Sequence, residues 1–162
     1  MPRQQSTYAN DLKLGKEAEE YYQKYIKEEF NLELKKLPKN YFADFINEEK
    51  KIIIELKRRN INMKRFPTTV IGYDKLEKFR EFNAKNGGHY LFLMVFYFND
   101  GIYYFEHKEG YKYVIGPYLR SERIGYVDKV KDHLYLPISK LEPMNNIKKY
   151  IESKKIIVRY NI

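Results

Sequence analysis

Apolar and polar positions alternate most clearly near the middle of the chain, where two short runs predict a β-hairpin. We place its strands at residues 41–46 and 51–57, joined by a polar turn centred on Glu48 and Glu49. The second run is almost wholly apolar, which is typical of a central strand that is covered on both faces. We therefore expect a layered sheet around this hairpin.

The turn of the hairpin decides which side chains meet across it. A two- or four-residue turn sets Asp44 opposite Ile53. Because side chains alternate between the two faces of a strand, Glu55 and Lys57 then share the face of Asp44. A slip by one residue would move Asp44 to the other face and separate it from Glu55.

Helical spacing of apolar residues precedes and follows the hairpin. It predicts a first helix from Asn10 or Asp11 to about Phe30. A second helix is predicted over residues 73–84, and the glycine pair at 87–88 ends it.

Short apolar runs and turn signals predict a β-rich second half. Residues 90–98 form an uninterrupted apolar run, and the turn signal at 99–101 leads into a partner strand at 102–105. Weaker patterns predict short strands at 111–115 and 134–138, where Pro117 and Pro137 favour edge strands or irregular connections. They also predict a short helix at 145–152 and a last strand at 156–160. The order of elements favours an α/β fold with a mixed central sheet flanked by helices.

Length and composition favour one domain over residues 1–162, because no Gly/Ser/Pro-rich linker divides the chain. No apolar run reaches membrane-spanning length, and the first residues lack an apolar signal core. The absence of cysteine excludes disulfides and thiolate zinc sites. We expect a soluble, intracellular protein of the cytoplasm or nucleus, or of the host cell if it is viral.

The charge balance of the chain indicates the class of molecule that it binds. The chain has 31 Lys and Arg against 22 Asp and Glu, which gives a net charge of +9 and a pI near 9.4. Such a balance favours a polyanion, most simply nucleic acid. A charged surface that only keeps the protein soluble is the alternative.

Acids and a lysine on the predicted hairpin suggest metal-assisted hydrolysis of a phosphodiester. Mg²⁺ prefers a few carboxylates with water and phosphate oxygens, and it both neutralises charge and activates water. Asp44, Glu55 and the backbone carbonyl of Leu56 would hold such an ion. Lys57 would orient the attacking water or stabilise charge on the phosphate oxygens. Glu19, at the edge of the apolar face of the first helix, would hold a metal-bound water.

Structural explanations of the same residues remain open. Glu55 and Lys57 would then form a solvent-facing ion pair on an edge strand. Glu19 would pair with a lysine one turn away along its own helix. Aromatic residues of the second half, such as Tyr103 and Tyr113, would either pack in the sheet or stack on bases.

Asp44, ten further residues and then Glu55-Leu56-Lys57 follow a helix that carries Gly15-x-x-x-Glu19. This pattern resembles the PD-(D/E)XK nuclease superfamily, also called restriction-endonuclease-like. The likeness covers roughly residues 11–106. Two features depart from it: Ala43 replaces the common proline, and residues 68–71 are the sole candidate for the expected third strand.

The resemblance implies an αβββαβ core over about 11–106, with a β-rich C-terminal extension over about 107–162. It implies Asp44 and Glu55 as metal ligands, Lys57 as the catalytic lysine and Glu19 as the helical acid. The implied cofactor is Mg²⁺, for which Mn²⁺ would substitute.

A basic loop follows the hairpin and is a candidate nucleic-acid contact. The residues expected to bind nucleic acid are Arg58, Arg59, Lys64, Arg65 and, on the second helix, Lys75. Lys75 also falls where some branches of the superfamily carry a lysine or glutamine.

The sequence thus predicts a Mg²⁺-dependent deoxyribonuclease, an endonuclease rather than an exonuclease, that acts in DNA restriction, repair or processing. The alternative is a non-catalytic nucleic-acid-binding protein that keeps the nuclease fold. RNA stays open as a substrate. A homodimer is attractive because cutting both strands of a duplex often needs two active sites.

Overall fold

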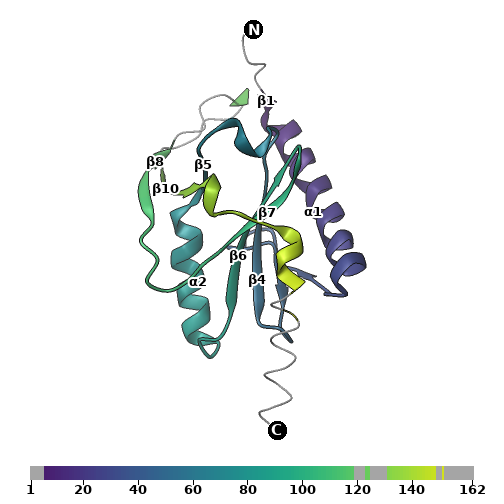
Figure 1. Ribbon diagram of the computed structural model, residues 1–162, viewed down its shortest axis with the longest axis vertical. Helices are drawn as coiled ribbons and strands as arrows, with labels where there is room; N and C mark the ends of the chain where they lie inside the picture. Colours follow the sequence, from purple (N-terminus) through teal and green to yellow (C-terminus); the bar gives the residue numbers. More distant parts are fainter. Residues whose placement is uncertain (1–5, 119–122, 125–130, 149–150, 152–162) are drawn as a thin grey trace.

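The computed structural model describes residues 6–118, 123–124, 131–148 and 151. It shows a layered α/β arrangement in which a sheet lies between two helices (Figure 1). Helix α1 (Tyr8–Phe30) packs on one face of this sheet, and helix α2 (Tyr73–Lys85) packs on the other. The predicted α/β class, with a mixed sheet and flanking helices, is therefore confirmed.

The large sheet has six strands: β2 (Lys35–Lys36), β3 (Phe45–Asn47), β4 (Ile52–Arg58), β6 (Leu91–Phe98), β7 (Gly101–Glu106) and β11 (Glu142–Pro143). Their order across the sheet is β11-β7-β6-β4-β3-β2, so β4 is a central strand. β4 and β6 are parallel, and α2 lies in the connection between them. A helix that returns between parallel strands runs antiparallel to both, so the first turn of α2 lies near the end of β4.

A second sheet has three strands: β5 (Thr68–Gly72), β8 (Val114–Tyr118) and β10 (Lys131–Pro137). Its order is β5-β10-β8, and both β5 and β10 contact α2. The candidate third strand therefore forms, but it pairs with β10 rather than with the large sheet. A short parallel pair joins β1 (Ser6–Thr7) to β9 (Arg123–Ile124), and 3₁₀ turns form at η1 (Met63–Arg65), η2 (Ile138–Lys140) and η3 (Met144–Asn146).

β3 and β4 form the predicted hairpin, but their register differs from the predicted one. Ile53 pairs with Ile46, so the predicted pairing of Asp44 with Ile53 is wrong. The turn covers residues 48–51 and is thus centred one residue later than expected, which shifts every pair by two positions. Because the shift is even, no side chain changes face.

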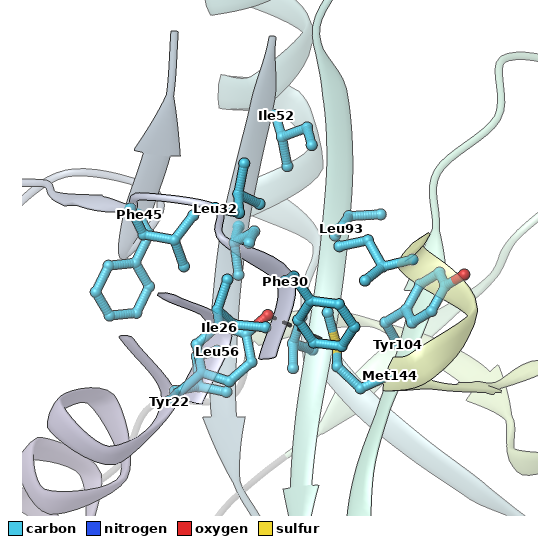
Figure 2. Close-up of a cluster of buried hydrophobic side chains, with 14 of the residues drawn as sticks. Tyr22, Ile26, Phe30, Leu32, Phe45, Ile52, Leu56, Leu93, Tyr104 and Met144 are labelled. Carbon is cyan, nitrogen blue, oxygen red and sulfur yellow. Dashed lines mark hydrogen bonds between the residues drawn. The ribbon is translucent and has the colours of Figure 1, made fainter. Parts of the chain in front are cut away.

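Alternation along β4 assigns its side chains to two separate cores. Ile52, Ile54 and Leu56 join the core under α1, whereas Ile53 joins the core under α2. This is the predicted arrangement of a strand covered on both faces. Figure 2 shows the α1-side core, where Tyr22 of α1 lies near Met144.

Residues after 106 contribute to both cores. Met144 and Ile147 belong to the α1-side core, and the Tyr22 hydroxyl lies 3.7 Å from the Met144 sulfur. Leu134 and Leu136 of β10 belong to the α2-side core. These side chains are buried among residues of the predicted core region, because β10 and η3 return to pack on it.

The helix boundaries agree with the predicted ones, but three strand predictions are wrong in their bounds. β3 covers Phe45–Asn47 instead of 41–46, so Asp44 precedes the strand, β8 covers Val114–Tyr118 instead of 111–115, and β10 covers Lys131–Pro137 instead of 134–138. α1 begins two residues before Asn10 and ends at the predicted Phe30. α2 ends where the Gly88 N–H donates to the Asn83 carbonyl at 2.7 Å, and both glycines that follow the helix have positive φ. Pro117 lies on the edge strand β8, whereas Pro137 is the last residue of β10.

Two C-terminal predictions have different outcomes. The helix predicted at 145–152 is represented by η3 and by helical residues 147, 148 and 151. The strand predicted at 156–160 lies outside the described residues. Within the described ranges, no helix is both long and apolar enough to cross a membrane.

The packing of Met144 generates a stability prediction. Met144→Ala should lower the free energy of unfolding by about 2–5 kcal/mol, because it leaves a cavity against Tyr22 in the α1-side core. Val114→Ala is the control, since Val114 is 66% exposed and its loss should change stability by less than about 0.5 kcal/mol. Urea unfolding measures both. Equal effects of the two substitutions would show that Met144 does not stabilise the α1-side core.

Candidate active site

The candidate site gathers side chains from four segments around the second half of β4. Glu55 and Lys57 project from β4 itself, and Asp44 immediately precedes β3. Lys75 lies in the first turn of α2, and Glu19 lies on α1. The topology brings them together because the hairpin and the start of α2 both adjoin this end of β4.

Glu55 is a buried carboxylate with two lysines beside it. Its residue is 3% exposed, and its Oε1 lies 3.0 Å from the Lys57 Nζ and 4.0 Å from the Lys75 Nζ. A buried charge without compensation is costly, so these two ammonium groups stabilise the ionised carboxylate. An exposed ion pair on an edge strand is therefore wrong as an explanation, because β4 is central and Glu55 is buried.

Asp44 bonds to β4 through its backbone and its side chain. Its N–H donates to the Ile54 carbonyl at 2.9 Å, and its Oδ2 accepts the N–H of Leu56 at 2.7 Å. The N–H and C=O of one strand residue point to the same side. The Leu56 carbonyl is thus directed toward the Asp44 side of β4, as a shared metal site requires.

The environment of Asp44 favours its protonated form. Burial, the negative charge of Glu55 and, more weakly, that of Glu19 raise the pKa of Asp44 to about 8. The Leu56 N–H and the Lys57 charge act in the opposite direction without cancelling this rise. A cation bound between Asp44 and buried Glu55 would offset the repulsion between the two carboxylates.

Glu19 approaches the site but has a different partner from the one considered in the sequence. Its Oε2 lies 3.2 Å from the Nζ of Lys36 on β2, a lysine far along the chain rather than one helical turn away. Its negative charge is near enough to contribute, more weakly than Glu55, to the raised pKa of Asp44. Sequence reasoning missed Lys36, since a two-residue edge strand gives no periodic signal.

The donor set fits Mg²⁺. Within the described ranges, no three Asp, Glu, His or Cys side chains already form a group that could hold a metal ion. Mg²⁺ needs fewer protein ligands, because it keeps several waters and takes one or two carboxylates with substrate phosphates. Asp44, Glu55 and the Leu56 carbonyl are oxygen donors of this type.

The basic residues predicted to contact nucleic acid divide into two groups. Arg58 donates to the Tyr97 carbonyl at 3.0 Å and to Asn99 Oδ1 at 2.6 Å. Arg59 hydrogen-bonds Thr69 and the Val70 carbonyl, so both arginines tie the end of β4 to neighbouring segments.

Lys64 and Arg65 lie on η1 and are exposed, whereas Lys75 lies at Glu55. The loop that carries η1 is fixed in place, because the Met63 N–H donates to Asp100 Oδ1 at 2.9 Å and the Asn99 N–H donates to the Ile61 carbonyl at 3.0 Å. Lys64 and Arg65 therefore lie exposed on a loop that these hydrogen bonds hold beside the end of β4.

Comparison with known proteins identifies the class. A family model described as "Phage putative PDDEXK endonuclease" matches residues 3–144. No curated protein sequence matches the chain significantly. Because the matched region covers most of the chain, this protein belongs to that family, and the resemblance to the PD-(D/E)XK superfamily is confirmed.

The raised pKa of Asp44 predicts how metal-free stability varies with pH. The folded state holds the proton of Asp44 more tightly than the unfolded chain, in which the pKa of this side chain is near 3.8. The stabilisation that this proton gives to the folded state is therefore complete below pH 3.8. It is lost as the pH rises through about 8. Asp44→Asn should therefore raise the melting temperature at pH 9 in EDTA, and the difference should shrink toward pH 4.

Thermal melts of the two proteins at several pH values measure this effect, for which 1 kcal/mol corresponds to about 2–4 °C. Added Mg²⁺ should stabilise the wild-type protein at pH 9 but not Asp44→Asn. A melting difference that does not change with pH would contradict the assigned environment of Asp44.

Proposed function

We propose that this protein is a Mg²⁺-dependent DNA endonuclease whose centre consists of Asp44, Glu55 and Lys57. The observation that carries this proposal is the placement of buried Glu55 beside Lys57, with Asp44 bound to the Leu56 N–H next to them. Membership of a family named for an endonuclease supports the class of reaction. The net charge of +9 supports a nucleic-acid substrate.

Asp44, Glu55 and the Leu56 carbonyl would hold the metal ion. When bound, Mg²⁺ would neutralise phosphate charge and lower the pKa of a water molecule. The Lys57 Nζ lies 3.0 Å from Glu55 Oε1, and Lys57 would donate to the attacking water or to a phosphate oxygen when substrate is present. Lys75, whose Nζ lies 4.0 Å from the same Glu55 oxygen, would add positive charge at the phosphate.

Glu19 would lie further from the metal ion than Asp44 and Glu55. It lies on α1, is partly exposed and is held by Lys36, so it would accept a hydrogen bond from a water molecule rather than bind the metal directly. Lys36 would keep this carboxylate oriented toward Asp44. Loss of either residue should therefore reduce activity less than loss of Asp44.

The superfamily core would correspond to α1, β3, β4, β5, α2 and β6 in chain order. The parallel crossover from β4 through α2 to β6 supports this correspondence, because it brings Lys75 to the end of the strand that carries Glu55. β5 differs, since it joins β10 instead of extending the large sheet. Residues after 106 would complete both cores rather than form a separate addition.

A cleavage assay on closed circular plasmid tests the proposal. An endonuclease converts closed circles to nicked or linear DNA, whereas an exonuclease cannot begin without an end. Wild-type protein should cut with Mg²⁺ or Mn²⁺ and not with EDTA. Asp44→Asn, Glu55→Gln and Lys57→Met should each lower the rate by at least about 10²-fold, the usual effect of losing one transition-state contact.

Lys24→Ala is the matched control, because the Lys24 side chain is 77% exposed on α1. It should cut at nearly the wild-type rate. Normal cleavage by all three site variants would overturn the residue assignment. A wild-type protein that binds DNA but cuts neither DNA nor RNA with either metal would favour the non-catalytic alternative.

A further inference from the structure

A groove lies between α2 and the loop that leads into Asp44. Its volume is about 570 Å³, and its wall on one side is formed by Asn40, Tyr41 and Phe42. The opposite wall is the exposed side of α2, where Lys78, Phe82 and Lys85 line it. Three aromatic and two basic residues thus line the groove together with Asn40, Glu81 and Asn86, and none of them belongs to the cluster around Glu55.

Packing fixes the aromatic wall while leaving part of it open. The Tyr41 ring lies 4.9 Å from the Phe42 ring and 6.4 Å from the Phe82 ring, centroid to centroid. Phe42 in turn packs edge-on against buried Phe92, at 6.3 Å. Tyr41 is nevertheless 38% exposed, so a positioned aromatic ring remains available to a ligand in the groove.

The charge of the groove fits a phosphate chain. Lys78 and Lys85 are exposed, and Glu81 is the one acid in the lining. The Lys78 Nζ lies 3.9 Å from Asp74 Oδ2, but both side chains are more than half exposed, at 57% and 52%. Such a surface pair is screened by water and contributes little, so Lys78 stays available to a stronger anion.

Each wall of the groove contains a residue three positions away from a residue of the candidate active site. Tyr41 is three residues before Asp44, so their Cα atoms are at most about 11 Å apart. Lys78 follows Lys75 by three residues, a rise of about 4.5 Å along α2. With a spacing of about 3.4 Å per nucleotide along a stacked strand, the near end of the groove at Tyr41 lies about three nucleotides from Asp44. The far end at Lys85, about 15 Å along α2 from Lys75, lies about four to five nucleotides away.

We propose that this groove binds an unpaired nucleotide of the substrate strand, with its base stacked on Tyr41 and its phosphates near Lys78 and Lys85. The inference rests on the proposed nuclease function and narrows its substrate class. Bases inside a duplex are already stacked on their neighbours, so only an unpaired base offers a face to an aromatic ring. The preferred substrate is therefore DNA with a single-stranded segment beside the cleavage site.

Binding in the Asp44→Asn background tests the groove without cleavage. The probes are a labelled single-stranded 20-mer, a blunt duplex of the same sequence and a forked duplex with unpaired arms, each followed by fluorescence anisotropy. The Asp44→Asn protein should bind the single strand and the fork more tightly than the blunt duplex. Adding Tyr41→Ala should weaken binding of these two probes by roughly 5- to 150-fold and change the duplex by less than about twofold.

Two control variants separate stacking from general surface effects. Tyr41→Phe keeps the ring and should bind like the parent protein. Tyr118→Ala removes a tyrosine of almost the same exposure, 37%, from the edge strand β8, and should also bind normally. An unchanged affinity of Tyr41→Ala for all probes, or an equal loss for all three, would overturn the proposal.

A scan with single abasic sites locates the stacked base. At one position of the single strand, removing the base should cost as much as Tyr41→Ala, and combining both should add nothing further. Additive losses at every position would reject stacking on Tyr41. Since this readout is binding, a protein that cuts plasmid but shows no Tyr41 effect would reject the groove and retain the nuclease.

Discussion

The burial of Glu55 on a central strand is the constraint on which the rest of the site depends. A carboxylate at 3% exposure in an otherwise apolar strand is tolerated because Lys57 and Lys75 lie beside it. Lys57 comes from β4 itself, whereas Lys75 comes from α2, so the second of these charges reaches Glu55 only when the parallel crossover is formed. The same packing brings Asp44 near Glu55, whose negative charge adds to the effect of burial in raising the pKa of Asp44.

The site and the fold are therefore coupled. The apolar residues that alternate with Glu55, such as Ile54 and Leu56, are buried under α1 and hold β4 in place. C-terminal residues such as Met144 complete that core. The position of the charged residues thus depends on packing contributed by segments far from them in the sequence, including those after residue 106.

The local features of the structure could be predicted from the sequence. Periodicity predicted α1, α2 and the hairpin, and the alternation of Ile53, Glu55 and Lys57 predicted one charged face. The register was predicted two residues away from the observed one, because turn position depends on backbone geometry that Glu48 and its neighbours do not specify. The β5–β10 pairing and the Lys36–Glu19 contact are tertiary, and no local pattern encodes them.

The proposed function requires Asp44, Glu55 and the Leu56 carbonyl to bind a divalent cation together. Anomalous scattering from a crystal soaked in Mn²⁺ would locate this ion. We expect a peak among these three groups, with the Lys57 ammonium displaced from Glu55 or sharing it with the ion. A peak elsewhere, or none while Lys57 stays at Glu55, would show that these groups do not form the metal site.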